Sequence, residues 1–416
     1  MFATKDLYGR VIGMTAGARV RQPRYGVETI ECPADSAWGE PEIERPASVS
    51  TPDSRIIELD GLRGIAILLV LLTHFFSYSM MGRQWSGVAA LAMKVTEPGW
   101  LGVDLFFVLS GFLITGILLN ARGDCHYARN FYMRRALRIL PLYLAVLLLM
   151  LVSYRGSGPA VLLGLAMSIN VAPILHIAVP LGGAALWSLA VEEHFYLIWP
   201  WIVRAVRPAT LGAVCISICL LEPAIRAAFR FQVDDVYFYS WFRFDGLAWG
   251  ALIAVLVHLR RLRGETSGKK PLMMGALLIA VSLAAIALGL PHGILHRANR
   301  LGAAFQFALA EMALAGFVLM VVTNTGSRAG AILRFPLLLL FGDLSYCLYI
   351  THEMVAGLID KIASHFVDLN AQMSRFSFIS IRAALAIALC LGIAILSRNF
   401  FERPILALKR YFKPAG

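Results

Sequence analysis

Long apolar runs separated by short polar joints fill the chain from about residue 60 onward. An α-helix needs about 20 apolar residues to cross the hydrocarbon core of a bilayer. Helices are required there because lipid offers the backbone no hydrogen-bond partners, and these runs lack the alternating pattern of a closed barrel. The sequence therefore predicts an all-α, polytopic transmembrane bundle of about ten spans, at residues 62–80, 100–119, 136–153, 187–203, 209–221, 241–258, 272–290, 301–322, 336–357 and 377–396.

The composition agrees with lipid as the solvent. Hydrophobic residues make up 58% of the chain and charged residues only 15%, against about 25% charged residues in soluble domains. The formal net charge is +12, and the basic residues stand mainly in the joints, as in RRALR at 134–138. Cytoplasmic loops of membrane proteins carry such an excess of Lys and Arg. Because no continuous basic soluble module exists, we expect the lipid bilayer, and no nucleic acid, as a partner.

The distribution of basic joints also predicts the topology. All of them can be cytoplasmic only if ten spans cross the membrane and both termini lie inside. The apolar segment 161–180 is then a re-entrant or peripheral segment, because polar residues and prolines interrupt it at Asn170, Pro173, His176 and Pro180.

Three regions follow from this pattern. Residues 1–54 are rich in Pro, Gly, Glu and Arg, and are predicted to be a disordered cytoplasmic tail. They contain no apolar core of a signal peptide, so we expect the first span to be an uncleaved anchor. The transmembrane domain is expected at 55–404, and a basic cytoplasmic tail at 405–416.

Ionisable side chains inside a span are costly in lipid and are candidates for function. Arg63 and His74 share the predicted first span and are eleven positions apart. That spacing puts them on nearly the same helix face, about 16 Å apart along the axis. An imidazole at His74 can accept a proton at neutral pH, as a general base does. The alternative is a histidine satisfied by a polar neighbour, with Arg63 as an ordinary anchor at the inner surface.

Two further spans carry acidic groups beside small or aromatic residues. Asp104 lies near the outer end of the second predicted span, with Ser110 further along it. Glu192 lies in ALWSLAVEEHFYLIWP, beside an apolar run. Either carboxylate can orient a histidine or share its proton. Interfacial placement of the acids and plain packing of the small residues remain the alternative for both segments.

The joint before the third span ends in RRALR, which contains Arg135 and Arg138. Residues three or four apart share a helix face, and guanidinium groups bind phosphate well. This pair therefore predicts contact with the phosphates of a cytosolic donor, and the alternative is simple anchoring on the cytoplasmic side.

The remaining candidates lie in two later segments. Arg243 and Asp245 in FRFDGLAWG are interpreted as a structural pair or as groups that orient substrate. Tyr349 and His352 in LSYCLYITHE are candidates for lining the same site, although a packed histidine is an equal alternative. No cysteine forms a close metal-type pair with a histidine, so we expect no metal site and no permanently bound cofactor.

Taken together, these ordered segments resemble the acyltransferase-3 family of inner-membrane O-acyltransferases. The resemblance runs from about residue 56 to 404 and rests on an Arg and a His separated by ten residues, GVDLFFVLSGFLI, RxxR, SLAVEEHFY, RFDGLAWG, LSYCLYITH and FERP.

The resemblance implies a ten-span bundle in the bacterial inner membrane. It also implies that acyl-CoA, usually acetyl-CoA, is the donor, and that a hydroxyl of a cell-envelope carbohydrate or lipid-linked glycan is the acceptor. Arg63 and His74 are then the essential pair, Arg135 and Arg138 form the RxxR element, and Glu192 occupies the family's glutamate position. No serine-nucleophile motif follows residue 397, so we expect the membrane domain to complete the transfer itself or to use a separate partner.

A transporter or flippase for a lipid-linked glycan is the main alternative. It would also place charged groups inside spans, but it would move its substrate without any need for CoA. Release of the free CoA thiol by purified protein distinguishes the two classes.

Overall fold

The computed structural model describes residues 56–412 except 181, 229–234, 266–267 and 297–298. All regular secondary structure in this part of the chain is helical. The tail expected at 1–54 and the last residues, 413–416, lie outside the described residues. The α-helices are α1 (Ile57–Leu72), α2 (Tyr78–Met80), α3 (Gly87–Thr96), α4 (Leu101–Asn120), α5 (Tyr127–Ser153), α6 (Gly158–Leu165), α7 (Leu186–Ala205), α8 (Pro208–Ala228), α9 (Asp235–Phe238), α10 (Phe244–Leu262), α11 (Lys269–Gly289), α12 (Arg300–Thr323), α13 (Pro336–Ala363), α14 (Leu369–Gln372), α15 (Phe376–Leu396) and α16 (Arg403–Ala407).

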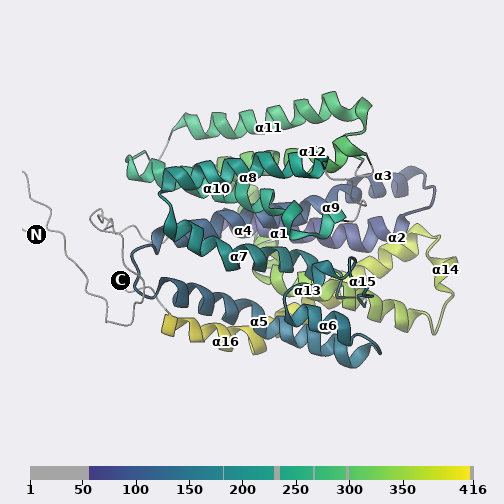
Figure 1. The fold of residues 1–416 in the computed structure, drawn as a ribbon. Coiled ribbons are helices and arrows are strands. Elements are labelled where there is room, and N and C mark those ends of the chain that lie inside the picture. The colour runs from purple at the N-terminus through teal and green to yellow at the C-terminus, as the bar shows by residue number, and fades with distance from the viewer. Residues whose placement is uncertain (1–55, 181, 229–234, 266–267, 297–298, 413–416) are drawn as a thin grey trace, which may run out of the picture. The chain divides into compact units, whose positions relative to one another are not determined.

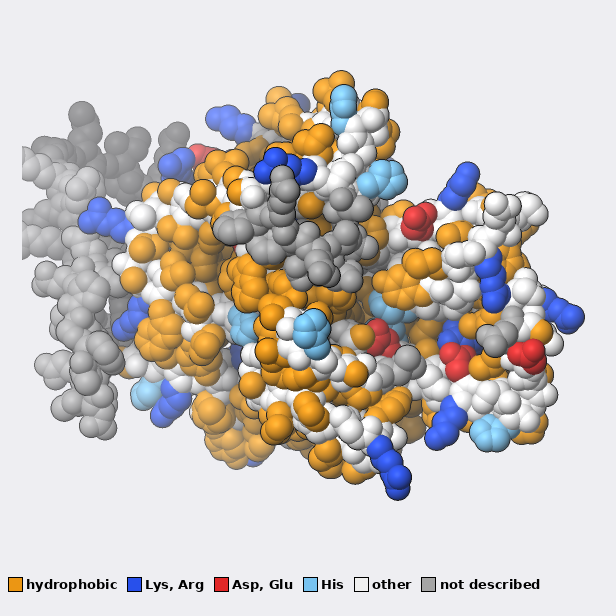
Figure 2. Space-filling view, turned by 45° about the vertical axis from the view of Figure 1, so that its right-hand side comes forward, with side chains coloured by type: hydrophobic (Ala, Val, Ile, Leu, Met, Phe, Trp, Pro, Cys, Tyr) orange, Lys and Arg blue, Asp and Glu red, His pale blue; other side chains and the backbone are white. Residues whose placement is uncertain are grey.

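Seven helical segments of the described part are long and apolar enough to cross a membrane: Ile57–Met80, Gly87–Asn120, Tyr127–Ser153, Pro208–Ala228, Lys269–His292, Arg300–Thr323 and Phe376–Phe412. On the face shown in Figure 2, hydrophobic side chains cover the middle, and many Lys and Arg side chains lie toward the ends. The chain is therefore an all-helical, multi-pass membrane protein, as the sequence predicts.

Each of the ten predicted spans overlaps one long helix, and three of those helices fall outside the seven segments. These three are α7, α10 and α13, with 20, 19 and 28 residues. α10 packs against α4 and α8, and α13 packs against α1 and α15, so both belong to the bundle. In Figure 1 the long helices run side by side, and α11 lies at one edge next to α12.

The connection between α5 and α7 contains no long helix among its described residues. α6 has eight residues, and a single 3-10 turn follows at Ile169–Val171. A helix of eight residues covers only about 12 Å, whereas the bilayer core is about 30 Å thick. The segment 161–180 is therefore not a full helical span.

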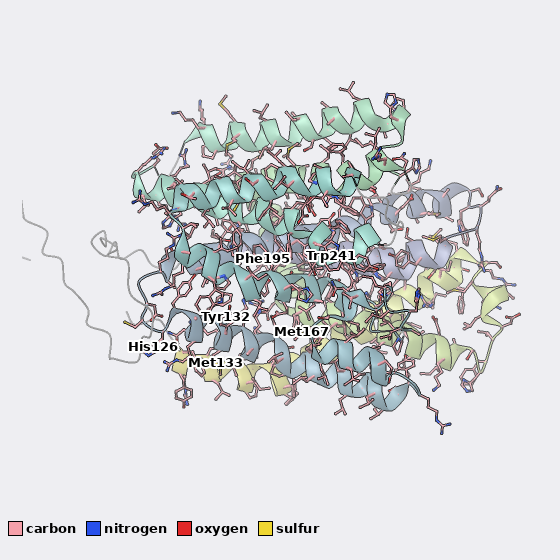
Figure 3. All side chains as sticks on the ribbon, in the orientation of Figure 1. His126, Tyr132, Met133, Met167, Phe195 and Trp241 are labelled. Carbon is pink, nitrogen blue, oxygen red and sulfur yellow. The ribbon has the colours of Figure 1, made fainter. Side chains whose placement is uncertain are left out.

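Aromatic contacts join α5 and α7. Tyr132 of α5, labelled in Figure 3, donates from its hydroxyl to the carbonyl oxygen of Leu197, at 2.9 Å. Tyr127 of α5 likewise donates from its hydroxyl to the carbonyl oxygen of Pro200 on α7, at 3.0 Å. These contacts fix the helix that carries Glu192 against the helix that carries the RxxR arginines.

Glycines allow α4 and α10 to approach closely. A Cβ on Gly111 would lie 1.9 Å from the carbonyl oxygen of Leu247, and a Cβ on Gly250 would lie 1.9 Å from that of Val108. Small residues are common where membrane helices touch through their backbones. Any side chain at these two positions would therefore force the helices apart.

We expect Gly111→Ala to lower the apparent Tm of the detergent-solubilised protein, with a loss of about 1–3 kcal/mol, the usual cost of overpacking. Gly116→Ala is the matched control, because it lies on the same helix and a Cβ there would meet nothing within 4 Å. Thermal unfolding followed by tryptophan fluorescence compares the two. Equal Tm values would show that the close approach of α4 and α10 is misassigned.

Candidate functional site

His74 lies where the first helix changes its geometry. α1 ends at Leu72 and continues as one π-helical turn, Thr73–Ser77, before α2 begins. The side-chain hydroxyl of Thr73 donates to the carbonyl oxygen of Thr96, at 2.7 Å, and so ties this turn to the end of α3. Single π-helical turns are rare overall, and those that occur often lie at functional sites. Here the turn holds the predicted base.

The ring of His74 has a defined tautomer. Its Nδ1 lies 2.8 Å from the carbonyl oxygen of Val70, one turn earlier in its own helix. A carbonyl oxygen only accepts hydrogen bonds, so Nδ1 carries the proton and Nε2 of the neutral ring carries a lone pair. The side chain is 22% exposed, and its Nε2 lies 3.6 Å from Oε1 of Glu353 on α13. An accessible nitrogen with a free lone pair beside a carboxylate is the arrangement that a general base requires.

The neighbours of His74 include two residues of α13, and the residue before α7 contacts one of them. The rings of His74 and His352 meet edge to face, with centroids 4.6 Å apart. Nδ1 of His352 donates to the carbonyl oxygen of Tyr349, at 2.6 Å. The backbone N–H of Ala185 donates to Oε2 of Glu353, at 3.2 Å. Segments far apart in the sequence therefore build one polar site around the imidazole of His74.

Two residues predicted to line the site have clear positions there. His352 is fully buried beside His74, and its Nε2 has no hydrogen-bond partner in the described part of the protein. The hydroxyl of Tyr349 shares a hydrogen bond with Oγ of Ser188, at 2.6 Å, and so joins α13 to α7.

A second group of predicted residues forms a basic cluster, which we define as Arg63, Arg135 and Arg138. Arg63 comes from α1 and the other two from α5, and the three guanidinium groups are electrostatic neighbours. Arg138 is exposed, and Arg63 and Arg135 are half-buried. Arg63 also donates to Oδ1 of Asp60, at 3.2 Å. Three guanidinium groups close together and within reach of solvent suit an anionic ligand.

Glu192 belongs to the side of the basic cluster rather than to His74. Its Oε2 accepts a hydrogen bond from the hydroxyl of Tyr196, at 2.8 Å. That hydroxyl also bonds to Oγ of Ser110 on α4. The guanidinium carbon of Arg135 lies 4.7 Å from the centroid of the Tyr196 ring. The structure therefore joins Glu192 and Ser110 to the arginines, and the carboxylate recorded beside His74 is Glu353.

Asp104, Arg243 and Asp245 lie in a buried ion network. Arg243 pairs with Asp104 of α4 and lies 3.7 Å from Oε1 of Glu311 on α12. Asp245 instead accepts from Nη2 of Arg226 on α8, at 2.5 Å. Arg243 and Asp245 therefore form their ion pairs with other residues, and remain electrostatic neighbours within one network. Residues two apart at the start of a helix do not face each other, so each finds its partner on another helix.

Sequence reasoning missed three members of this network: Glu222, Arg226 and Glu311. All three are buried. Each stands within or beside an apolar run, so the rule that ionisable residues in spans need an explanation would have found them. The contacts of the whole network link α4, α8, α10 and α12, which makes it a structural element of the bundle.

Comparison with known proteins adds a decisive observation. The Acyl_transf_3 model, described as an acyltransferase domain, matches residues 56–398. The chain belongs to the acyltransferase-3 family. The match covers both the His74 site and the basic cluster, and it confirms the resemblance seen in the sequence motifs. No solved structure matches the chain.

Several curated proteins similar to this chain come from Staphylococcus aureus. The provisionally named O-acetyltransferase SACOL0978 of strain COL is 27% identical over 381 residues, which cover 83% of this chain and 56% of the relative. The O-acetyltransferase OatA of strain NCTC 8325 / PS 47 is 25% identical over 374 residues, with the same two coverages. The chain therefore spans about half the length of the curated relatives it matches.

Proposed function

We propose that the protein is a membrane-bound O-acyltransferase. In this proposal it moves an acyl group, with acetyl as the default, from acyl-CoA to a hydroxyl of a cell-envelope carbohydrate or lipid-linked glycan. The observation that carries the proposal is the Nε2 lone pair of His74 beside Glu353, on the same helix as an arginine of the basic cluster. The names of the relatives, O-acetyltransferases, support the same reaction.

The proposed mechanism uses His74 as general base. Its Nε2 takes the proton of the acceptor hydroxyl as the oxygen attacks the thioester carbonyl. The tetrahedral intermediate then collapses, the carbon–sulfur bond breaks, and the CoA thiolate receives the proton from the imidazolium. Glu353 stabilises that imidazolium through its negative charge, and Nδ1 stays bonded to Val70. A variant in which Nε2 itself attacks the thioester, and passes the acyl group on, uses the same lone pair.

The basic cluster is proposed to hold the donor. Guanidinium groups bind phosphate oxygens through charge-assisted hydrogen bonds, and CoA carries phosphates at one end and the thioester at the other. Arg63 and His74 are eleven residues apart on one helical segment, about 16 Å along the axis. The pantetheine arm of CoA can span that interval, so the phosphates would stay at the inner surface while the thioester reaches His74.

The proposal also includes a topology for the membrane domain. Ten spans with both termini in the cytoplasm would place the RxxR joint on the cytosolic side, where acyl-CoA is present. The tails at 1–54 and 405–416 would then be cytoplasmic, and the membrane would be the bacterial inner membrane. The outer ends of the helices around His74 would face the side on which envelope glycans are exposed.

CoA-thiol release is the test of the proposed reaction. Protein in liposomes receives acetyl-CoA and envelope glycans extracted from a strain that lacks the protein, and free thiol is measured against time. We expect thiol release that depends on the glycan, together with new acetyl esters on the glycan by mass spectrometry. Glycan movement across the bilayer without thiol release would favour a flippase and contradict the proposal.

We expect Arg138→Gln to raise the KM for acyl-CoA by about 10- to 100-fold, since a hydrogen bond to a charged group contributes about 1.5–3 kcal/mol. The kcat should change little, because Arg138 does not touch the reacting atoms in this mechanism. Arg129→Gln is the control, with the same change of charge at an exposed position of α5. An equal KM in both variants would remove the basic cluster from donor binding.

A further inference from the structure

Three ligand atoms converge at the His74 site. His74, His352 and Glu353 each offer one, and these atoms all lie within 4.8 Å of one another. The Nδ1 atoms of both rings already donate to backbone carbonyl oxygens. The neutral rings therefore present Nε2 lone pairs, and the carboxylate presents oxygen lone pairs. None of the three groups offers a hydrogen-bond donor to the other two. A bound cation could accept one lone pair from each.

Adding a single proton does not give all three lone-pair atoms a partner. One proton shared between Nε2 of His74 and Oε1 of Glu353, which are 3.6 Å apart, satisfies only that pair. Nε2 of His352 stays buried with no hydrogen-bond partner among the described residues. A buried polar atom without a partner is costly, and such an atom in a native protein calls for an explanation. A cation that accepts all three lone pairs supplies one.

We propose that His74, His352 and Glu353 bind one divalent transition-metal ion of the zinc class, through the two Nε2 atoms and the Glu353 carboxylate. Two histidines and one glutamate are a known zinc ligand set that leaves a fourth position open. Imidazole nitrogen favours zinc, copper and nickel over magnesium and calcium. Zinc lies about 2.0–2.2 Å from such ligands, so the trio needs only a small side-chain closure.

Each ligand is already oriented by a second contact. The carbonyl oxygens of Val70 and Tyr349 fix the two imidazole rings, at 2.8 Å and 2.6 Å. The N–H of Ala185 fixes one oxygen of Glu353 and leaves Oε1 toward His74. Metal sites depend on such outer contacts, whose loss typically lowers affinity about 10- to 100-fold. No metal site is predicted from the sequence, because His74 and the pair His352 and Glu353 stand in different spans and converge only in the fold.

Metal binding has a consequence for catalysis, and this part rests on the proposed function. The ion would occupy the same lone pair of His74 that takes the proton of the acceptor hydroxyl. Binding and transfer therefore exclude each other, so zinc acts as a reversible inhibitor and a chelator restores activity.

Zinc titration of the full chain tests the site. The protein is purified in detergent in metal-free buffer, and Zn²⁺ binding is measured by calorimetry. We expect one ion per chain, and an affinity at least tenfold weaker in His352→Ala and in Glu353→Gln. His365→Ala is the matched control, because that histidine is exposed and its Nδ1 also bonds to a carbonyl oxygen four residues earlier, at 2.7 Å. No saturable binding, or equal binding in His352→Ala and the unsubstituted protein, would overturn the site.

X-ray absorption of the zinc-loaded, unsubstituted protein tests the ligand set without depending on how the variants fold. The spectrum should show two imidazoles and carboxylate oxygen around zinc, whereas sulfur or a single imidazole overturns the assignment. The two proposals fail separately. Glycan-dependent thiol release without zinc binding rules out the metal site alone, and zinc binding together with no thiol release in metal-free buffer rules out the transfer reaction alone. Zinc that binds but leaves transfer unchanged overturns the proposed inhibition.

Discussion

The variant His74→Ala is expected to lose about 10²- to 10⁴-fold in the rate of acyl transfer, the usual contribution of a general base. The loss should appear in kcat, because the imidazole acts on the reacting hydroxyl and does not hold the donor phosphates. Folding should be preserved, since the ring is 22% exposed and its Nδ1 bonds only within its own helix. Thiol release measures the rate, and size-exclusion chromatography with thermal unfolding checks the fold.

Two companion variants make this prediction specific. His365→Ala removes an exposed histidine outside the site and should keep full activity. Glu353→Gln should lower kcat by roughly tenfold or more, because the imidazolium loses its ionised neighbour 3.6 Å away, and opposite charges about 4 Å apart near a protein surface attract by up to about 4 kcal/mol. Normal turnover of His74→Ala would remove the base from the mechanism, whatever the other variants do.

The variant Arg243→Met is expected to destabilise the protein by about 3–5 kcal/mol, the cost of removing one partner from a buried ion pair. Arg243 is fully buried and pairs with Asp104, with Glu311 nearby. Its guanidinium carbon also lies 3.9 Å from the centroid of the Phe307 ring. Without Arg243, two acidic groups would stay buried without their cation. The apparent Tm in detergent should fall by several degrees.

A double variant separates charge from packing in this network. Adding Asp104→Asn to Arg243→Met removes the carboxylate left without its cation. The double variant should therefore lose less stability than the sum of the two single variants. Arg398→Gln is the control, because its ion pair with Asp343 is partly exposed, at 23% and 37% of the side chains. Such pairs contribute about 0–1 kcal/mol. A Tm drop no larger for Arg243→Met than for Arg398→Gln would contradict the structural role of the network.

The fold was largely predictable because lipid leaves the backbone few choices. Apolar runs had to be helices, and the ten predicted ranges each overlap a long helix. The errors concern helix ends. The range 209–221 was too short, because Glu222, Pro223 and Arg226 interrupt the apolar run, whereas α8 continues to Ala228. It does so because Arg226 is satisfied by Asp245 of α10, a contact that hydropathy cannot reveal.

The site was predictable only where its residues share a helix. The spacing of Arg63 and His74 put them on one face of the first span, and the spacing of Arg135 and Arg138 gave one basic face. The partner of His74 could not be found this way, since Glu353 stands on a helix far along the chain. The sequence favoured Glu192 or Asp104 for this role, and only the packing of α1 against α13 brings Glu353 to His74.

The π-helical turn at Thr73–Ser77 was also beyond the sequence. Nothing in THFFS distinguishes it from ordinary α-helix, and the turn depends on contacts such as Thr73 with Thr96. The network around Arg243 was half visible, because its members are ionisable residues in spans but their pairing depends on helices that meet only in the fold.

The most direct test of the central claim is a cryo-EM structure of the protein with bound CoA. The account predicts the CoA phosphates against Arg63, Arg135 and Arg138, with the sulfur close to Nε2 of His74. Because the imidazolium of His74 returns its proton to the CoA thiolate in this mechanism, the sulfur should lie within hydrogen-bond reach of Nε2. Phosphates bound away from the three arginines, or a sulfur atom separated from His74 by packed side chains, would contradict it.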